Sequence, residues 1–372
     1  MSKILYVSRE LTHMYFHLHY IKHLIENGHE VHIACEINKN TDDFKKCGIK
    51  LHNISFARKS ISINHKIAYS QLKTLYNTEN YDLIHFHTPI AGFIGRLAAK
   101  NTKAKIVYTA HGLHFFKGSP AINWILYYPL EKMAAKWTDV MILINKEDYN
   151  LVERKFSLRN NGQIYYINGV GVQLDLFEDK NYLLMKKYKK ELNICKSDMV
   201  ISCVGELNKN KNQIQLLQAL NNSKNKENVS LLIVGEGNEK QNLKDYCDKN
   251  GLNKVQFLGY RRDVANLLAI SDILVLVSHR EGLPKSLMEG MASSLALLGT
   301  NTRGIRDIIK DGINGYIVEI GDYNTLSEKI DYLYEDRVKL SSMKKESHML
   351  SNQYRIDFVI KQLDEIYNKI GV

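Results

Sequence analysis

The chain has 372 residues, of which 44% are hydrophobic and 24% are charged. This composition is typical of a globular protein, and the length exceeds what one hydrophobic core ordinarily supports, so two domains are expected. No run of about 18 apolar residues occurs, which excludes a membrane-spanning helix of ordinary length. The N-terminal segment has neither the apolar core nor the cleavage site of a signal peptide, so a cytoplasmic protein is expected.

The net charge of +11 is distributed unevenly. Residues 1–172 contain 22 Lys or Arg against 13 Asp or Glu, a net of +9, and 12 of the 14 histidines. The remaining residues contain 29 against 27, a net of +2. A basic first half suggests an anionic partner there, such as phosphate, a lipid surface or nucleic acid. An indifferent Lys-rich surface would explain the charge but not this asymmetry.

The five cysteines are scattered, and none forms a CxxC pair. An odd number of scattered cysteines favours reduced thiols over a disulfide framework or a zinc site. No Asp-x-Asp pair follows a predicted strand, so the residues themselves point to no metal–nucleotide site.

The first half of the chain alternates short apolar runs with amphipathic runs. Strands buried on both faces are predicted at residues 4–8, 30–35, 82–86, 105–110 and 139–144. One helix is predicted to end at the stop signal Asn27-Gly28, and others cover about 64–78, 91–101, 122–136 and 146–157. Such alternation indicates a parallel sheet of Rossmann type.

The pattern starts again after a connection at residues 167–177. Strands are predicted at 199–204, 229–234, 254–258 and 272–277, with helices near 211–222, 238–250, 263–270, 285–293 and 322–334. The fold class is therefore α/β, with two Rossmann-like domains at 1–172 and 173–353. Ligands of such sheets bind at the carboxyl ends of the strands, so we expect the domains to face each other across a ligand-binding cleft.

The stretch HREGLPKSLMEGMA, residues 279–292, follows the last of these strands. Gly282 and Pro284 predict a turn and a helix that starts near residue 284, and the amides of a helix N-terminus can bind an anion. Glu281 precedes the turn and Glu289 lies on the helix. Carboxylates accept hydrogen bonds from vicinal sugar hydroxyls. A phosphate site flanked by two carboxylates fits a nucleotide sugar, although the spacing of two glutamates alone would be unspecific.

The wider sequence resembles a known family. GYRRDVANLLAISDILVLVSHREGLPKSLMEGMA, followed by TRGIRDIIKDGINGYIV, closely resembles the retaining glycosyltransferases of family 4, which have the GT-B fold. YTAHGLHFFKG in the first half and VGELNKNKNQ at the start of the second half match in the same order. The resemblance spans nearly the whole chain. It is strongest to transferases that build bacterial capsular or exopolysaccharide repeat units, and a C-terminal helix at about 354–372 is expected to pack on the first domain.

The resemblance assigns roles to individual residues. Glu281 matches the carboxylate that holds donor-sugar hydroxyls, and Glu289 matches the one that binds the nucleotide ribose. Lys211 matches the lysine that neutralises the diphosphate leaving group, where a cation stabilises the charge that grows as the glycosidic bond breaks. His111 matches a histidine that contacts the donor sugar from the first domain. The other donor-binding candidates are Gly205, Arg261, Gly282, Leu283, Lys285, Ser286 and Leu287.

Five positions of the first half are candidates for acceptor binding. The loop after the first strand contains no glycine, which argues against a dinucleotide oxidoreductase, and Arg9, His13 and Tyr15 there are expected to shape the acceptor site. His87 and its neighbour His85 are expected just past a strand end. An acceptor role and plain packing remain equally open for both.

The chain departs from the family at the start of the second domain. The family usually has Gly-Arg-Leu there, whereas this chain has Gly205-Glu206-Leu207. Because a carboxylate would repel a diphosphate, Glu206 is expected to point elsewhere or to pair with Lys209. Arg280 or Lys285 is a candidate for the missing positive charge.

The resemblance implies a retaining hexosyl- or N-acetylhexosaminyltransferase. Its donor would be a nucleotide sugar, UDP-linked by expectation, and its acceptor a glycan on a lipid diphosphate. It implies no metal and no other cofactor. One alternative is a UDP-sugar epimerase on a similar scaffold. Another is a nucleic-acid-binding protein, which the charge of +11 suggests, but no recognition motif supports it and no nucleic acid is expected.

Residues 115–137 suggest contact with a membrane. Four aromatic residues alternate there with lysines that an anionic leaflet would attract. The aromatic residues are Trp124, Tyr127, Tyr128 and Trp137, and the lysines are Lys117, Lys132 and Lys136. The alternative is that the aromatics belong to the core, which is expected for about half of them. The hypothesis is reversible, peripheral attachment to the inner face of the cell membrane.

Overall fold

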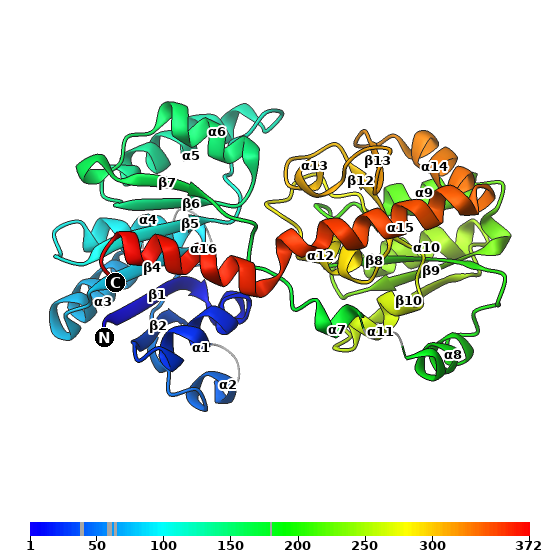
Figure 1. The fold of residues 1–372 in the computed structure, drawn as a ribbon. Helices are drawn as coiled ribbons and strands as arrows, with labels where there is room; N and C mark the ends of the chain where they lie inside the picture. Colours follow the sequence, from blue (N-terminus) through cyan, green and yellow to red (C-terminus); the bar gives the residue numbers. More distant parts are fainter. Residues whose placement is uncertain (38–40, 58–61, 63–64, 179–180) are drawn as a thin grey trace. The chain divides into compact units, whose positions relative to one another are not determined.

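The computed structural model describes residues 1–372 except 38–40, 58–61, 63–64 and 179–180 (Figure 1). The chain divides into two compact units. Unit 1 is Met1–Val170 with Asp357–Val372, and unit 2 is Gly171–Ile356. The sequence-based boundaries were placed after residues 172 and 353.

Unit 1 contains a parallel sheet of seven strands, in the order β3-β2-β1-β4-β5-β6-β7. The direction of the strand order reverses between β1 and β4, and at such a switch point doubly wound sheets bind ligands. The strands are β1 (Lys3–Glu10), β2 (Glu30–Glu36), β3 (Lys50–Asn53), β4 (Leu83–His87), β5 (Lys105–Ala110), β6 (Val140–Leu143) and β7 (Gln163–Tyr166). The helices are η1 (Leu11–Phe16), α1 (Leu18–Glu26), α2 (Asp42–Lys45), α3 (His65–Glu79), α4 (Pro89–Ala99), α5 (Ala121–Ala135), α6 (Lys146–Lys155), η2 (Arg159–Asn161) and, from the C-terminus, α16 (Ile356–Lys369).

Unit 2 repeats this plan with six parallel strands, in the order β10-β9-β8-β11-β12-β13. Here the order reverses between β8 and β11. The strands are β8 (Met199–Val204), β9 (Val229–Val234), β10 (Val255–Gly259), β11 (Ile273–Leu276), β12 (Ala296–Thr300) and β13 (Gly315–Val318). The helices are α7 (Asp175–Glu178), α8 (Tyr182–Glu191), α9 (Gln213–Asn222), η3 (Lys226–Asn228), α10 (Lys240–Lys249), α11 (Val264–Ala269), α12 (Lys285–Ala292), α13 (Ile305–Ile308), α14 (Tyr323–Glu335), α15 (Arg337–Ser351) and η4 (Asn352–Tyr354).

The predicted α/β class with two Rossmann-like sheets is confirmed. The sequence analysis missed strands β3, β7, β12 and β13 and helices α8 and α15. The residues of β3 and β7 are largely exposed or half-buried, because these strands lie at the edges of their sheet and carry little apolar signal. A glycine interrupts the apolar run of β12, and β13 is only four residues long and begins with a glycine, which weakens the strand pattern of both. All five cysteines are free thiols, as expected.

Close packing in unit 1 depends on small residues of α4. A Cβ atom at Gly95 would lie 2.2 Å from the ring of Phe86 on β4, so a larger residue would push the helix away from the sheet. Arg96, fully buried on the same helix, donates to Glu131 of α5 at 2.5 Å and lies 3.9 Å from the ring centre of Tyr108. A buried ion pair thus ties α4 to α5.

Helix α16 belongs to unit 1, although its sequence follows unit 2 (Figure 1). The hydroxyl of Tyr367 lies 2.6 Å from Nδ1 of His85 and 3.0 Å from the hydroxyl of Tyr6. Asp364 accepts a hydrogen bond from Tyr20 at 3.1 Å. The C-terminal helix is therefore fastened to the sheet by buried polar contacts. No helix in the described part of the chain is long and apolar enough to cross a membrane.

Candidate functional site

Lys211 and Glu281 meet at the switch point of the unit 2 sheet. Lys211 follows β8 and Glu281 follows β11, two neighbouring strands. Asn210 joins the two loops, since its side chain donates to the carbonyl of Arg280 at 3.0 Å and its carbonyl accepts from the amide of His279 at 2.8 Å. Parallel strands end at the same edge of a sheet, so both loops reach the position where ligands bind in such folds.

The side chains of Lys211 and Glu281 form an ion pair with an Nζ–Oε1 distance of 2.6 Å. Both are largely buried, with exposed fractions of 21% and 12%. Gly205 lies beneath the lysine, because a Cβ there would be 3.4 Å from Lys211 Cε. The structure therefore brings together three of the predicted donor-site residues. The pair offers a cation for a phosphate and a carboxylate for hydroxyl groups in one place.

Helix α12 begins directly after this pair, at Lys285, as the sequence predicted. No side chain caps its N-terminus at Pro284. Glu289 lies one turn into the helix, 3.2 Å from Lys285 Nζ. Burial raises the pKa of Glu289, and the neighbouring lysine acts in the opposite direction.

The predicted backbone donors around α12 differ in their environments. The side chains of Leu283 and Leu287 are buried, so only their backbone can meet a ligand. The amide of Leu287 already donates to the carbonyl of Pro284 at 3.2 Å, which makes it a poorer candidate than expected. Gly282 and Ser286 are half-buried.

Arg303 is a site residue that the sequence analysis did not single out. It is buried, and its Nε donates to the backbone carbonyl of Glu281 at 3.3 Å. Gly304, with φ of 74°, packs so closely that a Cβ would lie 2.2 Å from the carbonyl of Gly282. Arg303 belongs to the segment TRG, which begins one of the stretches that resemble the family. Its position just after a strand was not recognised, because β12 was not predicted as a strand.

The structure distinguishes between the two alternatives for Glu206, which is expected to point elsewhere or to pair with Lys209. Glu206 is exposed, and the structure shows no ion pair between it and Lys209 among the residues it describes. Lys285 pairs with Glu289 at 3.2 Å, much as Lys211 pairs with Glu281, so Lys285 and Arg280 both stay candidates for the missing positive charge. Arg261 is held by Asp263, with an Nε–Oδ1 distance of 2.7 Å. It follows β10, which β9 separates from β8, and its guanidinium bonds to Asp263 and not to the Lys211–Glu281 pair.

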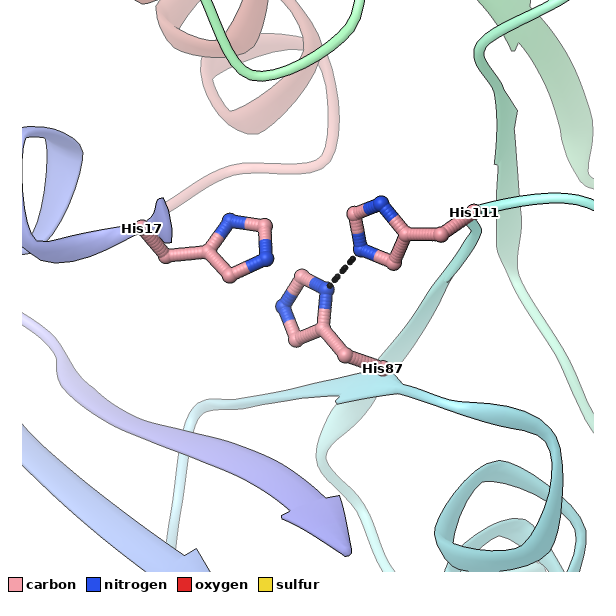
Figure 2. A group of neighbouring side chains, drawn as sticks. All are labelled: His17, His87 and His111. Atoms are coloured by element: carbon pink, nitrogen blue, oxygen red, sulfur yellow. Dashed lines mark hydrogen bonds between the residues drawn. The ribbon is translucent and has the colours of Figure 1, made fainter. Parts of the chain in front are cut away.

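In unit 1, three histidines converge at the carboxyl edge of the sheet (Figure 2). His17 follows η1, His87 is the last residue of β4, and His111 follows β5. Nδ1 of His87 lies 3.1 Å from Nε2 of His111, and the ring centres of His17 and His87 are 4.0 Å apart. His17 was not predicted as a site residue. Nothing in the sequence pattern distinguishes it from the other histidines.

His85 and His87 lie within β4, not past its end as expected. Nε2 of His85 lies 2.7 Å from the hydroxyl of Thr109, and its Nδ1 contacts Tyr367, so His85 serves packing between the sheet and α16. His87 instead faces His111. The structure thus assigns His85 to packing and leaves both alternatives open for His87.

These histidine rings are electrically neutral near pH 7. Burial, and to a smaller extent the neighbouring His13, lower the pKa of His111 to about 4. The pKa values of His17 and His87 are also well below the usual range, first because of burial and then because of the adjacent rings. A neutral ring can exchange hydrogen bonds with a sugar hydroxyl without adding charge. One nitrogen from each of His17, His87 and His111 lies within 4.8 Å of the others, close enough for three imidazoles to hold a divalent ion.

A small pocket of about 290 Å³ joins His111 to the predicted acceptor residues Arg9 and His13. Arg9 is the next-to-last residue of β1 and pairs with Glu10, while His13 lies on η1. Thr88, another lining residue, has φ of 65°, an uncommon conformation for a β-branched residue that is typical of functional sites. Its hydroxyl accepts from the amide of Arg9 at 3.1 Å, which joins the ends of β1 and β4.

Tyr15, in contrast, does not line this pocket. Its ring packs 4.8 Å from that of Phe44, and its hydroxyl donates to Asp43. The prediction that Tyr15 shapes an acceptor site is therefore not supported by its position.

The aromatic residues proposed for membrane contact are mostly packed inward. Trp124, Tyr127 and Tyr128 are half-buried against the core of unit 1. The exposed residues of α5 are aliphatic instead: Ile122, Ile125, Leu130 and Met133. Lys117, Lys132 and Lys136 are exposed near them in the sequence. The segment thus has an exposed apolar and basic surface, but its apolar part differs from the predicted one.

Comparison with known families divides the chain in the same way as the fold. Residues 3–145 match the family described as "Glycosyl transferase 4-like", and residues 185–353 match "Glycosyl transferases group 1". The chain is 33% identical to EpsD of Bacillus subtilis (strain 168), a protein described as a glycosyltransferase, over 95% of this chain and 92% of that protein.

Two further similarities extend over the full length. A UDP-Gal:alpha-D-GlcNAc-diphosphoundecaprenol alpha-1,3-galactosyltransferase of Escherichia coli is 26% identical over 91% of this chain and 87% of the enzyme. The crystal structure of HepE from Anabaena in complex with UDP and glucose has a TM-score of 0.82 at 18% identity, and the match covers 99% of this chain and all of that one. Its likeness shows the fold, which is that of the GT-B glycosyltransferases. The chain belongs to the glycosyltransferases of the family 4 type.

Proposed function

We propose that the chain is a retaining glycosyltransferase of bacterial cell-surface polysaccharide synthesis. It transfers a hexosyl or N-acetylhexosaminyl residue from a UDP-sugar to a glycan linked to a lipid diphosphate. The observation that carries this proposal is the Lys211–Glu281 pair at the start of α12. The name of the E. coli relative supports both substrates, because that enzyme uses UDP-Gal and a diphosphoundecaprenol-linked sugar.

The unit 2 residues have separate tasks in this proposal. Lys211 neutralises the diphosphate as it departs, and the free amides at the N-terminus of α12 add partial positive charge. Glu281 accepts hydrogen bonds from donor-sugar hydroxyls, and Glu289 binds the ribose. Arg303 is a positioning residue, since its Nε donates to the backbone carbonyl of Glu281.

The transfer proceeds on one face of the donor sugar. The bond between C1 and the diphosphate oxygen breaks, and its electron pair goes to the leaving phosphate. The acceptor hydroxyl oxygen forms the new bond to C1 on the same face and gives its proton to the departing phosphate oxygen. No protein nucleophile takes part, and the proposal includes no metal or other cofactor. The neutral ring of His111 contacts a hydroxyl of the donor sugar.

Peripheral attachment to the inner face of the cell membrane completes the proposal. A lipid-linked acceptor lies in a bilayer, so the enzyme must reach that surface. The exposed Ile122, Ile125 and Met133 of α5 suit the bilayer interface, and Lys132 and Lys136 suit its anionic headgroups.

The experiment is a transfer assay with purified full-length protein. A panel of nucleotide sugars is first screened by saturation-transfer NMR. Each binder is then incubated with a synthetic acceptor sugar on a lipid diphosphate, and Lys211→Ala serves as the inactive control. Transfer of one UDP-sugar to the lipid-linked sugar is expected. Conversion of free UDP-sugar to its epimer without any transfer would contradict the proposal.

A further inference from the structure

A second and larger cavity of unit 1 lies beside the pocket at His111. It has a volume of about 470 Å³, within the range of about 300–1,000 Å³ that is typical of small-molecule sites. Its walls come from α3, α4, the segment after β5, and α5. Ile90, Phe93, Leu97 and Leu130 are lining residues that also remain partly accessible from outside.

Few charged groups in the walls of this cavity would oppose the binding of an apolar ligand. Glu131 lines it, but its carboxylate is bound to the buried guanidinium of Arg96. That guanidinium in turn donates to the carbonyl of Gly92 and lies over the ring of Tyr108. The buried charges at the cavity are therefore satisfied within the protein. Lys66, which is exposed, and His65, which is half-buried, also line it from α3, and most of the remaining lining is aliphatic or aromatic.

The large cavity and the small pocket share one wall. Pro89, Ile90, Gly112, His114 and Tyr127 line both of them. The small pocket adds Arg9, His13, Thr88 and His111. An apolar space thus lies beside a polar space that is lined by an arginine and His111. This arrangement fits an amphiphile with an apolar chain in one part and a polar head in the other.

We infer that the large cavity binds the first isoprene units of the lipid diphosphate acceptor, next to its diphosphate. This inference rests on the proposed function, which supplies the lipid-linked acceptor. The diphosphate lies in the small pocket near Arg9, and the sugar it carries reaches His111. A cavity of this size holds only a short part of a long isoprenoid. The rest of the chain leaves past Leu130, on the helix whose exposed apolar residues are proposed to meet the bilayer.

Both tryptophans of the chain can report on this cavity. The ring of Trp124 lies 5.5 Å from Phe115, and that of Trp137 lies 6.0 Å from Phe93, and both phenylalanines line the cavity. Because the chain has no other tryptophan, a chain that enters the cavity is expected to change the protein's intrinsic fluorescence.

The test is a fluorescence titration of the full-length protein with farnesyl diphosphate, without any donor. A saturable change is expected, and farnesol and inorganic diphosphate should each bind at least tenfold more weakly. Each buried methylene strengthens binding by about fourfold, so loss of the chain is the larger effect. Arg9→Ala should weaken farnesyl diphosphate binding and leave farnesol binding unchanged.

Leu130→Asp places a charge on the cavity wall and should weaken farnesyl diphosphate binding at least tenfold. Ile125→Asp is the matched control, because Ile125 is exposed on the same helix but does not line the cavity. If Leu130→Asp does not fold, Leu97→Asp on α4 replaces it. No saturable signal, or equal binding by the wall and control variants, would overturn the inference. Equally tight binding of dodecyl diphosphate would overturn the isoprenoid assignment.

These readouts are independent of catalysis. Farnesyl diphosphate binding with this pattern, together with failed sugar transfer, would refute the proposed transferase reaction but keep the isoprenoid cavity. Sugar transfer without such binding would support the proposed transferase reaction but refute the isoprenoid cavity.

Discussion

Lys211 and Glu281 are 70 positions apart in the sequence, yet their side chains form an ion pair of 2.6 Å at the carboxyl ends of neighbouring strands. The contact is prepared by backbone and amide hydrogen bonds between the two loops, chiefly those of Asn210. The lysine is thus held next to the start of α12 before any ligand arrives. A charge that is already in position needs no reorganisation during the reaction, so it stabilises the transition state at little cost.

Replacement of this lysine should affect turnover far more than stability. Lys211→Ala is expected to lower kcat by about 100-fold or more, because the diphosphate loses a positioned cation. The fold should persist, because the pair lies at the open edge of the sheet with exposed fractions of 21% and 12%, so water can solvate Glu281 once the lysine is gone. Steady-state kinetics and thermal unfolding measure both effects. The exposed Lys209, replaced by Ala, is the control, and equal kinetics for the two variants would contradict the assignment.

Replacing the two glutamates should change different kinetic constants, kcat for Glu281 and the KM of the donor for Glu289. Glu281→Ala is expected to reduce kcat by about 100-fold, as expected for a polar contact made in the transition state. Glu289→Ala should mainly raise KM for the donor, because ribose binding is alike in the ground and transition states. Near-wild-type kinetics in both variants would show that these carboxylates do not form the donor site.

Glu206 should tolerate a reversal of charge. Its side chain is exposed, so Glu206→Arg breaks no ion pair with Lys209 and adds a cation where related enzymes carry one. Donor affinity is expected to stay unchanged or to improve, which calorimetry with the nucleotide sugar can measure. A large loss of activity with an intact fold would instead assign Glu206 a role of its own.

Stability should depend on pH through the buried histidines of unit 1. Burial lowers the pKa of His85 to about 3, whereas an unfolded histidine titrates near about 6.5. Between these values the unfolded chain binds the additional proton. The stabilisation is therefore complete above pH 6.5 and is lost as the pH falls towards 3.

Replacing His85 measures how much this histidine contributes to the pH dependence of stability. Between pH 7 and pH 5 the histidine accounts for at most about 2 kcal/mol of lost unfolding free energy. His85→Gln should reduce the pH dependence of urea unfolding by up to that amount, whatever its effect at pH 7. His279→Gln, at an exposed position, should leave the dependence unchanged. An unchanged dependence in His85→Gln would mean that this ring is protonated in the folded protein.

Vesicle binding should depend on both charge and the apolar face of α5. Replacing Lys117, Lys132 and Lys136 by Glu is expected to abolish binding to anionic vesicles, since each basic residue near such a surface contributes about 1 kcal/mol. Binding by the wild type should also weaken as salt rises, because the Debye length at physiological ionic strength is about 8 Å. Co-sedimentation measures this. Equal binding to neutral and anionic vesicles would contradict attachment through this surface.

The sequence predicted the parts of the fold with strong periodicity. Central strands such as β8 and β9 are nearly continuous apolar runs because helices cover both of their faces, and this pattern is readable without a structure. Edge strands such as β3 carry half-exposed residues whose partner is far away in the sequence, so no local pattern marks them.

The residues of the candidate site could be predicted only where they lie in a recognisable sequence motif. Lys211, Glu281 and Glu289 lie in segments that resemble a family. His17 and Arg303 enter the site through tertiary contacts that no spacing reveals, the first through ring contacts with His87 and the second through the backbone of Glu281. The inward packing of Trp124 could not be predicted either, since an amphipathic helix can turn its aromatic or its aliphatic face to the core.

The central claim is transfer from a UDP-sugar to a lipid diphosphate-linked sugar with retained configuration at C1. The most direct measurement is the proton NMR spectrum of the isolated product, in which the coupling constant of the new anomeric proton distinguishes the two configurations. With an α-linked donor, an α-linked product that also forms in the presence of EDTA is predicted. A β-linked product would contradict same-face transfer and require a general base in its place.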